Sequence, residues 1–280
     1  MGWSLNSIIQ REEISPNTHM MRIYTPHVAR KARPGQFVII QADVKGERIP
    51  LNIADWDEES VTCIFMEVGT STRKFASLKA GDSVPTCAGP LGLPSHLENF
   101  GAVLLIGGCY GIGAIYPHAR ELKKLGNRVI SIIEGRSKHM LYWAEKLKGA
   151  SDHLLSVTRD GSIGEKGHVP QPLSALIKKE GINRVFVTGC TFLMKLVSDT
   201  TRSLNVKTIV CLNPIMIDGT GMCGVCRVSV GGKTKFACVD GPDFDGHEVD
   251  WELLLARRKT YTEEELCSLG SWESMRYPTE

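Results

Sequence analysis

Residues 102–126, AVLLIGGCYGIGAIYPHARELKKLG, decide the fold class of this chain. Their first part, Ala102–Ile106, is an apolar run typical of a strand that is buried on both faces. A glycine-dense turn follows, and apolar residues from Ile112 to Leu125 then recur at helical spacing. Gly126 stands where helices commonly end. A strand, a glycine turn and a helix in this order are typical of a nucleotide-binding α/β unit.

The alternation of strands and helices continues after this unit. We expect strands at Arg128–Glu134, His153–Thr158, Arg184–Thr188 and Val206–Leu212, and helices at His139–Lys148, Pro172–Lys179 and Thr191–Leu204. Five apolar strands with helices between them predict a parallel sheet that helices cover on both faces. The sequence therefore predicts an α/β parallel-sheet nucleotide-binding domain over residues 99–212.

The residues before this unit follow a different pattern. Met20–Tyr24, Gln36–Gln41 and Val61–Val68 are short segments, rich in apolar or β-branched residues and separated by Pro, Gly, Asp and Asn. We expect no helix of ten residues or more among them. Because closure removes exposed strand edges, residues 1–98 are predicted to form a small antiparallel β-barrel.

Length and composition exclude several classes of protein. A chain of 280 residues fits two domains with a small appendage. With 42% hydrophobic residues, 23% charged residues and a net charge of +2, the chain resembles neither a disordered nor a nucleic-acid-binding protein. Its apolar runs are far shorter than the ~20 residues that span a bilayer, and its N-terminus lacks the pattern of a signal peptide. We therefore expect a cytoplasmic protein without a membrane or nucleic-acid partner.

Three of the nine cysteines lie close together in the sequence. The pattern Asp218-x4-Cys223-x2-Cys226-x11-Cys238 has the spacing of a plant-type [2Fe–2S] loop in which aspartate replaces the first cysteine. Thiolates are soft, anionic donors that suit iron. A zinc site of three cysteines and a carboxylate, or a loop of free cysteines, is the alternative interpretation.

The remaining C-terminal residues divide into two segments. Residues 213–246 are rich in Gly, Asp and Cys and too short to bury a core of their own, so we expect a small iron–sulfur subdomain there. Residues 247–280 form a charged tail that we expect to be helical at first and to lie on a partner or on the parent domain.

Further candidates for cofactor binding are weaker when each is taken alone. The glycine turn 107–113 could let a pyrophosphate approach the backbone at a helix N-terminus, although such turns also serve as tight connectors. Glu134 ends the second strand, where an acidic residue can bind a ribose 2′-hydroxyl and favour NAD over NADP. Arg136 and Lys138 could instead bind a 2′-phosphate, or all three residues could belong to a solvated loop. The stretches RIPLNI, residues 48–53, and VGTST, residues 68–72, are predicted by themselves to be a strand edge and a turn.

Taken together, the motifs resemble the ferredoxin–NADP reductase superfamily. They are RIPLNIAD, VGTST, AGPLG, GGCYGIGAIYP, TRDGSIGEKG, VFVTGC and the cysteine loop, and the resemblance covers residues 5–260. Within this superfamily the chain is similar to the branch that contains the electron-transfer subunit of dihydroorotate dehydrogenase. It is more similar to the small subunit of NADH-dependent ferredoxin:NADP oxidoreductase, also described as a sulfide dehydrogenase subunit.

The resemblance implies an oxidoreductase subunit of a heterodimer. NAD(H) would exchange a hydride with FAD, and a [2Fe–2S] cluster would pass single electrons to a larger flavin and iron–sulfur subunit. The family's activity is an electron-bifurcating reaction with ferredoxin and NADP(H). Alternatives are the electron-transfer subunit of a dihydroorotate dehydrogenase or a sulfide dehydrogenase, a self-contained reductase, and a non-catalytic relay or docking subunit.

The resemblance also assigns residues to each cofactor. FAD would be bound by Arg48, Pro50, Leu51, Asn52, Ile53, Val68, Gly69, Ser71 and Thr72. The nicotinamide nucleotide would be bound by Gly108, Gly111, Ile112, Gly113, Glu134, Arg136, Gly189 and Cys190. The cluster ligands would be Asp218, Cys223, Cys226 and Cys238, with aspartate where the dihydroorotate-type branch has cysteine. An alternative role for Asp218 is to accept hydrogen bonds from loop amides. No catalytic side chain is expected, and Cys190, beside the nicotinamide, needs no nucleophilic role.

Overall fold

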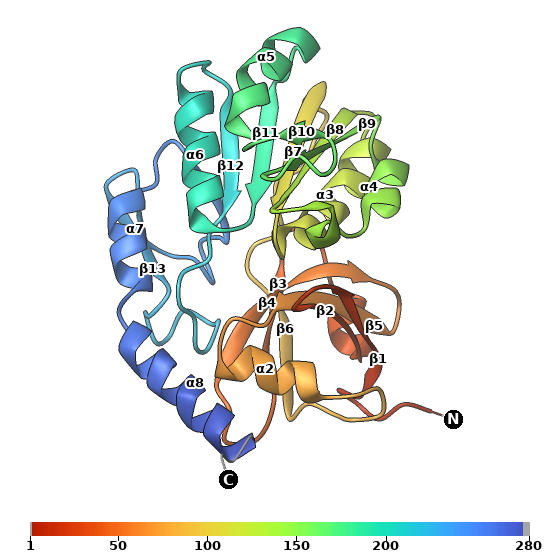
Figure 1. Ribbon diagram of the computed structural model, residues 1–280, viewed down its shortest axis with the longest axis vertical. Helices are drawn as coiled ribbons and strands as arrows, with labels where there is room; N and C mark the ends of the chain where they lie inside the picture. Colours follow the sequence, from red (N-terminus) through yellow and green to blue (C-terminus); the bar gives the residue numbers. More distant parts are fainter. Residues whose placement is uncertain (1, 277–280) are drawn as a thin grey trace.

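The computed structural model describes residues 2–276 and begins with an antiparallel barrel (Figure 1). Its strands are β1 (Ile8–Ser15), β2 (Thr18–Tyr24), β3 (Phe37–Gln41), β4 (Arg48–Trp56), β5 (Ser60–Met66) and β6 (Thr86–Leu91), in the order β1-β2-β5-β4-β3-β6. The start of β1 meets the segment that leads into β6, because Ser7 pairs with Ser83 and Ile8 donates its N–H to Asp82 O at 2.8 Å. The predicted antiparallel barrel is confirmed.

Two short helices interrupt the barrel strands, α1 (Pro26–Ala29) and α2 (Thr70–Ser77). Neither reaches ten residues, as expected. The prediction of a simple turn at residues 68–72 is wrong, because Gly69 is the N-cap of α2 and the hydroxyl of Thr72 closes its first turn.

The second part of the fold is built on a seven-stranded sheet in the order β10-β9-β8-β7-β11-β12-β15. The five predicted parallel strands are β7 (Ala102–Gly108), β8 (Arg128–Gly135), β9 (His153–Thr158), β11 (Arg184–Thr188) and β12 (Lys207–Cys211). Helices α3 (Gly111–Lys124) and α4 (Ala144–Ala150) cover one face, and α5 (Pro170–Glu180) and α6 (Thr191–Arg202) cover the other (Figure 1). Along β7, Val103 and Leu105 pack under α3, whereas Leu104 and Ile106 pack on the opposite face. The predicted parallel sheet is confirmed.

Two elements of this sheet differ from the prediction. The expected helix at His139–Lys148 is broken into a 3-10 turn, Lys138–Met140, and α4, because Trp143 takes a left-handed conformation with φ 55°. The break brings Tyr142 to the glycine turn, where its hydroxyl donates to Cys109 O at 2.9 Å. The sheet also gains two edge strands that were not expected, β10 (Glu165–Lys166) and β15 (Asp243–Asp245).

The C-terminal residues are attached to both preceding parts. The strands β13 (Arg227–Val230) and β14 (Lys233–Phe236) form a hairpin, and β15 pairs antiparallel with β12. Helix α7 (Trp251–Arg258) packs on β13, and α8 (Thr262–Arg276) runs along α2 (Figure 1). There Thr70 Oγ1 lies 3.0 Å from Ser268 Oγ, and Arg73 pairs with Glu273.

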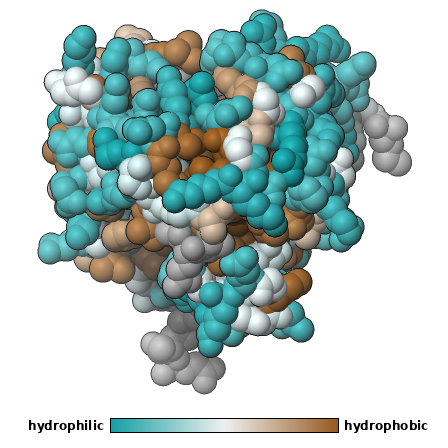
Figure 2. Space-filling model, turned by 90° about the horizontal axis from the view of Figure 1, so that it is seen from above, coloured by the Kyte–Doolittle hydropathy of each residue, from teal (hydrophilic) through white to brown (hydrophobic). Residues whose placement is uncertain are grey.

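One face of the molecule shows how polar and apolar side chains are distributed. Seen from above, side chains are mostly hydrophilic around a small hydrophobic hollow (Figure 2). Within residues 2–276, no helix is long and apolar enough to cross a membrane.

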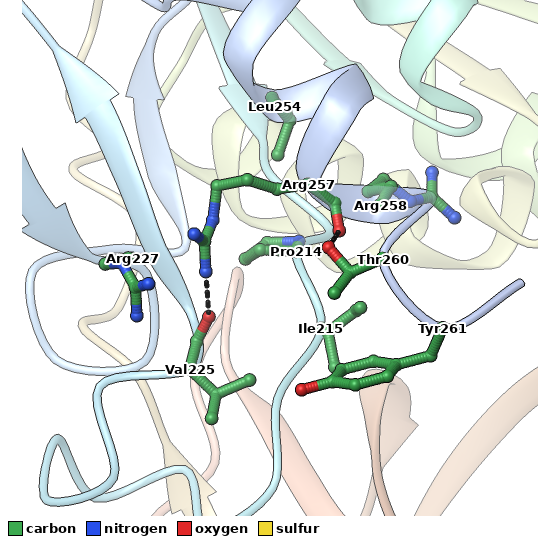
Figure 3. Close-up of a pocket in the computed structure, with 9 residues that line it drawn as sticks. All are labelled: Pro214, Ile215, Val225, Arg227, Leu254, Arg257, Arg258, Thr260 and Tyr261. Carbon is green, nitrogen blue, oxygen red and sulfur yellow. Dashed lines mark hydrogen bonds between the residues drawn. The ribbon is translucent and has the colours of Figure 1, made fainter. Parts of the chain in front are cut away.

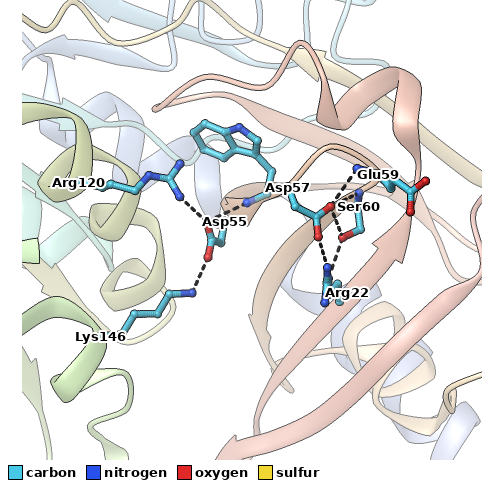
Figure 4. Close-up of polar contacts among 8 residues, drawn as sticks. Arg22, Asp55, Asp57, Glu59, Ser60, Arg120 and Lys146 are labelled. Carbon is cyan, nitrogen blue, oxygen red and sulfur yellow. Dashed lines mark hydrogen bonds and ion pairs between the residues drawn. The ribbon is translucent and has the colours of Figure 1, made fainter. Parts of the chain in front are cut away.

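An ion-pair cluster fixes the barrel against the parallel sheet (Figure 4). Asp55 of β4 accepts from Arg120 Nη1 of α3 at 2.7 Å and from Lys146 Nζ of α4 at 2.5 Å. The two cations also stack on aromatic rings, Arg120 on Trp56 at 4.6 Å and Lys146 on Trp143 at 4.0 Å. Because one carboxylate bridges two cations from different helices, it favours a single orientation of the barrel.

A second junction joins three segments through buried polar groups. His118 of α3 has Nδ1 3.1 Å from Ala114 O and Nε2 2.7 Å from Ser95 Oγ, and Ser95 Oγ lies 2.5 Å from Asp243 Oδ2. Nδ1 must be a donor, since it faces a carbonyl. The single hydroxyl hydrogen of Ser95 cannot serve both its contact with His118 Nε2 and its contact with Asp243 Oδ2. The cluster of His118, Ser95 and Asp243 therefore holds one further proton, on His118 or on Asp243. Burial lowers the pKa of His118 and raises the pKa of Asp243, which favours a protonated Asp243 beside a neutral His118.

This junction predicts how stability depends on pH. Between about pH 4 and 6.5 the folded cluster binds one proton, and the unfolded chain also binds one, on His118. Above pH 6.5 the unfolded chain releases its proton while the folded cluster keeps its own, so the free energy of unfolding should fall by up to about 1.4 kcal/mol per pH unit. Below pH 4 the unfolded chain gains a second proton, and stability should fall again.

Asp243→Asn tests this assignment, because its amide can donate to Ser95 as the protonated acid does. The variant should lose the decline above pH 6.5 and instead lose stability below that pH, where only unfolded His118 is charged. The measurement is urea unfolding at pH 5.5, 6.5 and 8.5. Ser95→Ala is the comparison, since it removes the bridge and should cost about 1–3 kcal/mol at every pH. The same slope above pH 6.5 in Asp243→Asn and in the natural protein would contradict the prediction.

Candidate functional site

The glycine turn between β7 and α3 lies at the carboxyl ends of the parallel strands, where α/β sheets bind ligands. A Cβ atom on Gly111 would lie 2.1 Å from Thr188 O, and one on Gly108 would lie 2.6 Å from Leu193 Cδ2. Glycine is therefore needed at position 111, where the clash is with backbone atoms, whereas at position 108 the end of the Leu193 side chain would have to move. The same packing fixes the position of the turn.

The next two residues of the predicted nucleotide site point into the protein. Ile112 is fully buried, and a Cβ atom on Gly113 would lie 2.5 Å from Ile64 Cδ1 of the barrel. The N–H of Gly113 donates to Tyr142 Oη at 3.1 Å. The exposed edge of the turn is instead formed by Cys109, in a left-handed conformation with φ 54°.

Residues from several strand ends surround Cys109. Desolvation, followed by Cys190 and Glu134, raises the pKa of the Cys109 thiol, whereas Arg159 and Arg136 act in the opposite direction. The structure thus brings the predicted residues Glu134, Arg136 and Cys190 to one edge of the sheet. Arg159 was not singled out in the sequence, because its place beside Arg136 depends on the pairing of β8 with β9.

The carboxylate of Glu134 already has partners in the protein. It is 7% exposed and accepts from the N–H of Val169 at 3.0 Å, while His168 Nδ1 lies 3.3 Å from its other oxygen. These contacts hold the segment that leads into α5. The guanidinium of Arg136 is exposed at the same edge. The predicted role of Glu134 at a ribose thus depends on the lone pairs that these contacts leave free.

A chain of hydrogen bonds connects the glycine turn with α7. Arg258 Nη1 donates to Thr191 Oγ1 at 2.5 Å, and Thr191 donates to Asn213 Oδ1 at 3.1 Å. Asn213 Nδ2 then donates to Tyr110 Oη at 2.6 Å, and Tyr110 donates to Gly189 O at 2.8 Å. All four hydrogen bonds are donated in the same direction, from Arg258 toward Gly189, so each bond polarises the next. Sequence reasoning missed this chain, because its members come from four separate segments.

The predicted flavin residues of β4 alternate between two sides of the strand. Leu51 and Ile53 belong to the barrel core, and Arg48 is exposed at the start of the strand. Asn52 and Pro50 are half-buried on the other side, where Asn52 Nδ2 donates to Cys211 Sγ at 3.4 Å. The side of β4 that carries Asn52 therefore faces the end of β12.

The other predicted flavin residues lie at the N-terminus of α2, a position that favours anions. Thr72 Oγ1 accepts from the N–H groups of Val68 at 2.9 Å and Gly69 at 3.0 Å, so this hydroxyl stabilises the helix end. Ser71 Oγ donates to the exposed Glu47 at 2.5 Å. A flavin phosphate would thus meet the backbone amides of the first turn, with Ser71 beside them.

The cysteine loop packs directly on the barrel. Gly219 has φ +75°, and a Cβ atom there would lie 2.8 Å from both Ile39 of β3 and Leu91 of β6. Cys226 and Cys238 are buried with their sulfurs 3.2 Å apart, whereas Cys223 is exposed. Two thiols at this separation can bind the same iron.

The fourth predicted ligand, Asp218, accepts hydrogen bonds from its own loop. Its Oδ1 lies 2.8 Å from the N–H of Thr220, and its Oδ2 lies 2.9 Å from the N–H of Cys223. The Thr220 amide is the largest cause of the lowered pKa of Asp218, so the carboxylate is ionised at neutral pH. Each oxygen keeps a lone pair, so both roles predicted for Asp218 fit this geometry.

A single zinc ion and a two-iron cluster make different demands on this donor set. In the part of the chain that the structure describes, no three His, Cys, Asp or Glu side chains converge on one metal position. Zinc in a tetrahedral site needs four ligands around one ion, whereas a two-iron cluster spreads its four ligands over two irons. Burial and the Cys226 thiol raise the pKa of Cys238 to about 12, so the thiolate forms only where a metal compensates its charge.

Comparison with known proteins agrees with this arrangement. Residues 213–250 match the family described as the iron–sulfur cluster binding domain of dihydroorotate dehydrogenase B. The chain is 44% identical over 269 residues to the dihydroorotate dehydrogenase B (NAD(+)) electron transfer subunit homolog of Thermotoga maritima, covering 95% of each chain. It is 28% identical to the corresponding subunit of Enterococcus faecalis, covering 87% of this chain and 96% of that one.

Solved structures agree as well. A chain of the NADH-dependent reduced ferredoxin-NADP oxidoreductase, studied for flavin-based electron bifurcation, superposes with a TM-score of 0.92. The two chains are 42% identical, and the superposition covers 97% of the present chain and 99% of the oxidoreductase chain. The reductase of carbazole 1,9a-dioxygenase, 16% identical with a TM-score of 0.61, shares the fold alone.

The hydrogen-bond chain predicts a specific effect of Tyr110→Phe. Loss of the hydroxyl removes the hydrogen bonds of Tyr110 with Gly189 O and Asn213 Nδ2 and leaves only the longer Asn213 Nδ2–Gly189 O contact of 3.4 Å, so the free energy of unfolding should fall by about 1–2 kcal/mol. Tyr116→Phe on α3 is the matched control and should change stability by less than about 0.5 kcal/mol. The measurement is urea unfolding of both variants. Equal free energies of unfolding in the two variants would show that the hydrogen-bond chain does not contribute to stability.

Proposed function

The chain belongs to the family of dihydroorotate dehydrogenase B electron-transfer subunits and their homologues, and from this membership we propose that it carries electrons from NAD(H) to a larger partner subunit. It is an oxidoreductase-type electron-transfer subunit of a flavin and iron–sulfur enzyme family. The finer proposal is that FAD, NAD(H) and a [2Fe–2S] cluster are its cofactors. We place it in the cytoplasm, where its nine unpaired cysteines stay reduced.

One observation carries the proposal: the three candidate sites meet around the barrel. The cysteine loop packs on β3 and β6 at Gly219, and Asn52 of the neighbouring β4 reaches Cys211 at the end of the parallel sheet. Electron transfer needs cofactors that lie close together in a fixed arrangement. These contacts would keep the flavin between the nucleotide edge and the cluster.

The residues of the chain would bind and orient the cofactors. Asn52 and Pro50 would face the flavin ring, and the first turn of α2 with Ser71 would bind its phosphates. The glycine turn, Gly189 and Cys190 would hold the nicotinamide nucleotide. When bound, FAD accepts a hydride and releases single electrons, for which an iron–sulfur cluster is the acceptor. No general acid or base is needed, which is consistent with the absence of a predicted catalytic side chain.

The proposed partner is a larger flavin and iron–sulfur subunit that forms a heterodimer with this chain. The likeness to the NADH-dependent reduced ferredoxin-NADP oxidoreductase supports an electron-bifurcating role in which the partner binds ferredoxin and NADP(H). Apolar side chains near the exposed Cys223 support a docking surface, since Met222 is 89% exposed, Ile217 48% and Val239 41%.

A second candidate function is electron transfer to a dihydroorotate dehydrogenase catalytic subunit. The names of the relatives from Thermotoga maritima and Enterococcus faecalis favour it. A relay that binds no nucleotide would be favoured if bulky side chains filled the glycine turn. It loses support because the side chain of Tyr110 is turned inward to Gly189 and Asn213.

Anaerobic visible absorbance tests the proposal. The purified chain should show a flavin and iron–sulfur spectrum that NADH bleaches, with NADPH in a parallel cuvette giving a slower or smaller change. A spectrum that dithionite bleaches but neither nucleotide affects would support the relay alternative. A colourless protein that contains zinc would exclude the iron–sulfur proposal.

Asp218→Cys tests the proposed carboxylate ligand. Replacing a hard oxygen donor by a soft thiolate should change the electron paramagnetic resonance spectrum of the reduced cluster and shift its reduction potential. Asp240→Asn, at a carboxylate outside the ligand set, is the control and should leave the spectrum unchanged. An unaltered spectrum in Asp218→Cys, with the cluster bound, would mean that Asp218 only accepts amide hydrogen bonds.

A further inference from the structure

Two arginines hold consecutive carbonyls of the cysteine loop. Arg227 Nη1 donates to Gly224 O at 3.1 Å, and Arg257 Nη2 donates to Val225 O at 3.2 Å. Both carbonyls lie between the predicted ligands Cys223 and Cys226. The guanidinium groups are thus hydrogen-bonded to the backbone that joins these two cysteines, and the Val225 carbonyl shares its peptide unit with Cys226.

The two arginines differ in their surroundings. Arg257 extends from α7 toward Val225 along a cavity of about 140 Å³ (Figure 3). It is half-buried, and the neighbouring Leu254 is 2% exposed. Arg227, at the start of β13, is exposed to solvent. Since solvent screens an exposed charge more strongly, Arg257 should have the larger electrostatic effect.

Neither charge is neutralised by a carboxylate of the described residues. Over residues 2–276, no ion pair involves Arg227 or Arg257. A side chain that only had to hold a carbonyl could do so without a net charge, as an amide does. The two positive charges therefore act on whatever occupies the loop.

We propose that Arg257, with Arg227 as a weaker second charge, raises the reduction potential of the iron–sulfur cluster and thereby favours the passage of electrons to it. A cluster bound by thiolates and a carboxylate is anionic, and reduction adds a further negative charge. A positive charge beside it stabilises the reduced form more than the oxidised form, and nearby charges and hydrogen bonds are known to tune such potentials. This inference rests on the proposed function, because it requires the cluster.

Arg257→Gln and Arg257→Lys separate charge from hydrogen bonding. The readout is a redox titration of the purified full chain, followed by electron paramagnetic resonance of the reduced cluster. We expect a more negative potential in Arg257→Gln, a smaller shift in the same direction in Arg227→Gln, and a potential near the natural one in Arg257→Lys. Lys259→Gln is the matched control, because Lys259 is the exposed C-cap of the same helix and its loss changes the net charge equally.

Three outcomes would overturn the inference. The first is an unchanged potential in Arg257→Gln, and the second is an equal shift in Lys259→Gln, which would reflect net charge alone. The third applies if the Arg257→Gln variant fails to bind the cluster. In that case an unchanged reduction potential in Arg227→Gln would overturn the inference. The absence of a cluster signal from the natural protein is a different failure, because it contradicts the proposed function itself.

Discussion

The antiparallel pairing of β15 with β12 is the contact on which the arrangement of the three sites depends. Cys211 pairs with Asp243 and Ile209 with Asp245, so the segment after the cysteine loop becomes part of the parallel sheet. Phe244 between them is buried in the same core as the sheet's own strands. A segment that is too short to bury a core is thereby stabilised by the core of its neighbour.

Fixing both ends of the cysteine loop has consequences for electron transfer. The loop begins at Asn213, whose side chain is hydrogen-bonded to Tyr110 of the glycine turn. After the loop, the polypeptide enters the sheet as β15. Gly219 between them is pressed against the barrel. The loop cannot move away from the barrel without breaking contacts with the sheet, which is the rigidity that a short electron path requires.

Local patterns were sufficient to predict the five parallel strands, three strands of the barrel and the helices α3, α5 and α6, because periodicity depends only on neighbouring residues. They failed where tertiary contacts overrode propensity. The three-residue strand Asp243–Asp245 contains two aspartates and has no apolar pattern, so only its place beside β12 makes it a strand. The helix expected at His139–Lys148 breaks at Trp143, and the break places the buried hydroxyl of Tyr142 against the glycine turn.

The residues of the candidate site also differ in whether local sequence could predict them. The cysteine spacing and the glycine turn could be recognised because each is contained in one segment. By contrast, the partners of Tyr110 and of Glu134 come from loops that the topology brings together. Glu134 illustrates the consequence: a residue type chosen for a ribose at a strand end also serves as the acceptor for the Val169 amide. Residue type and position along a strand identify a possible ligand, but only the folded neighbours determine which of its lone pairs are free.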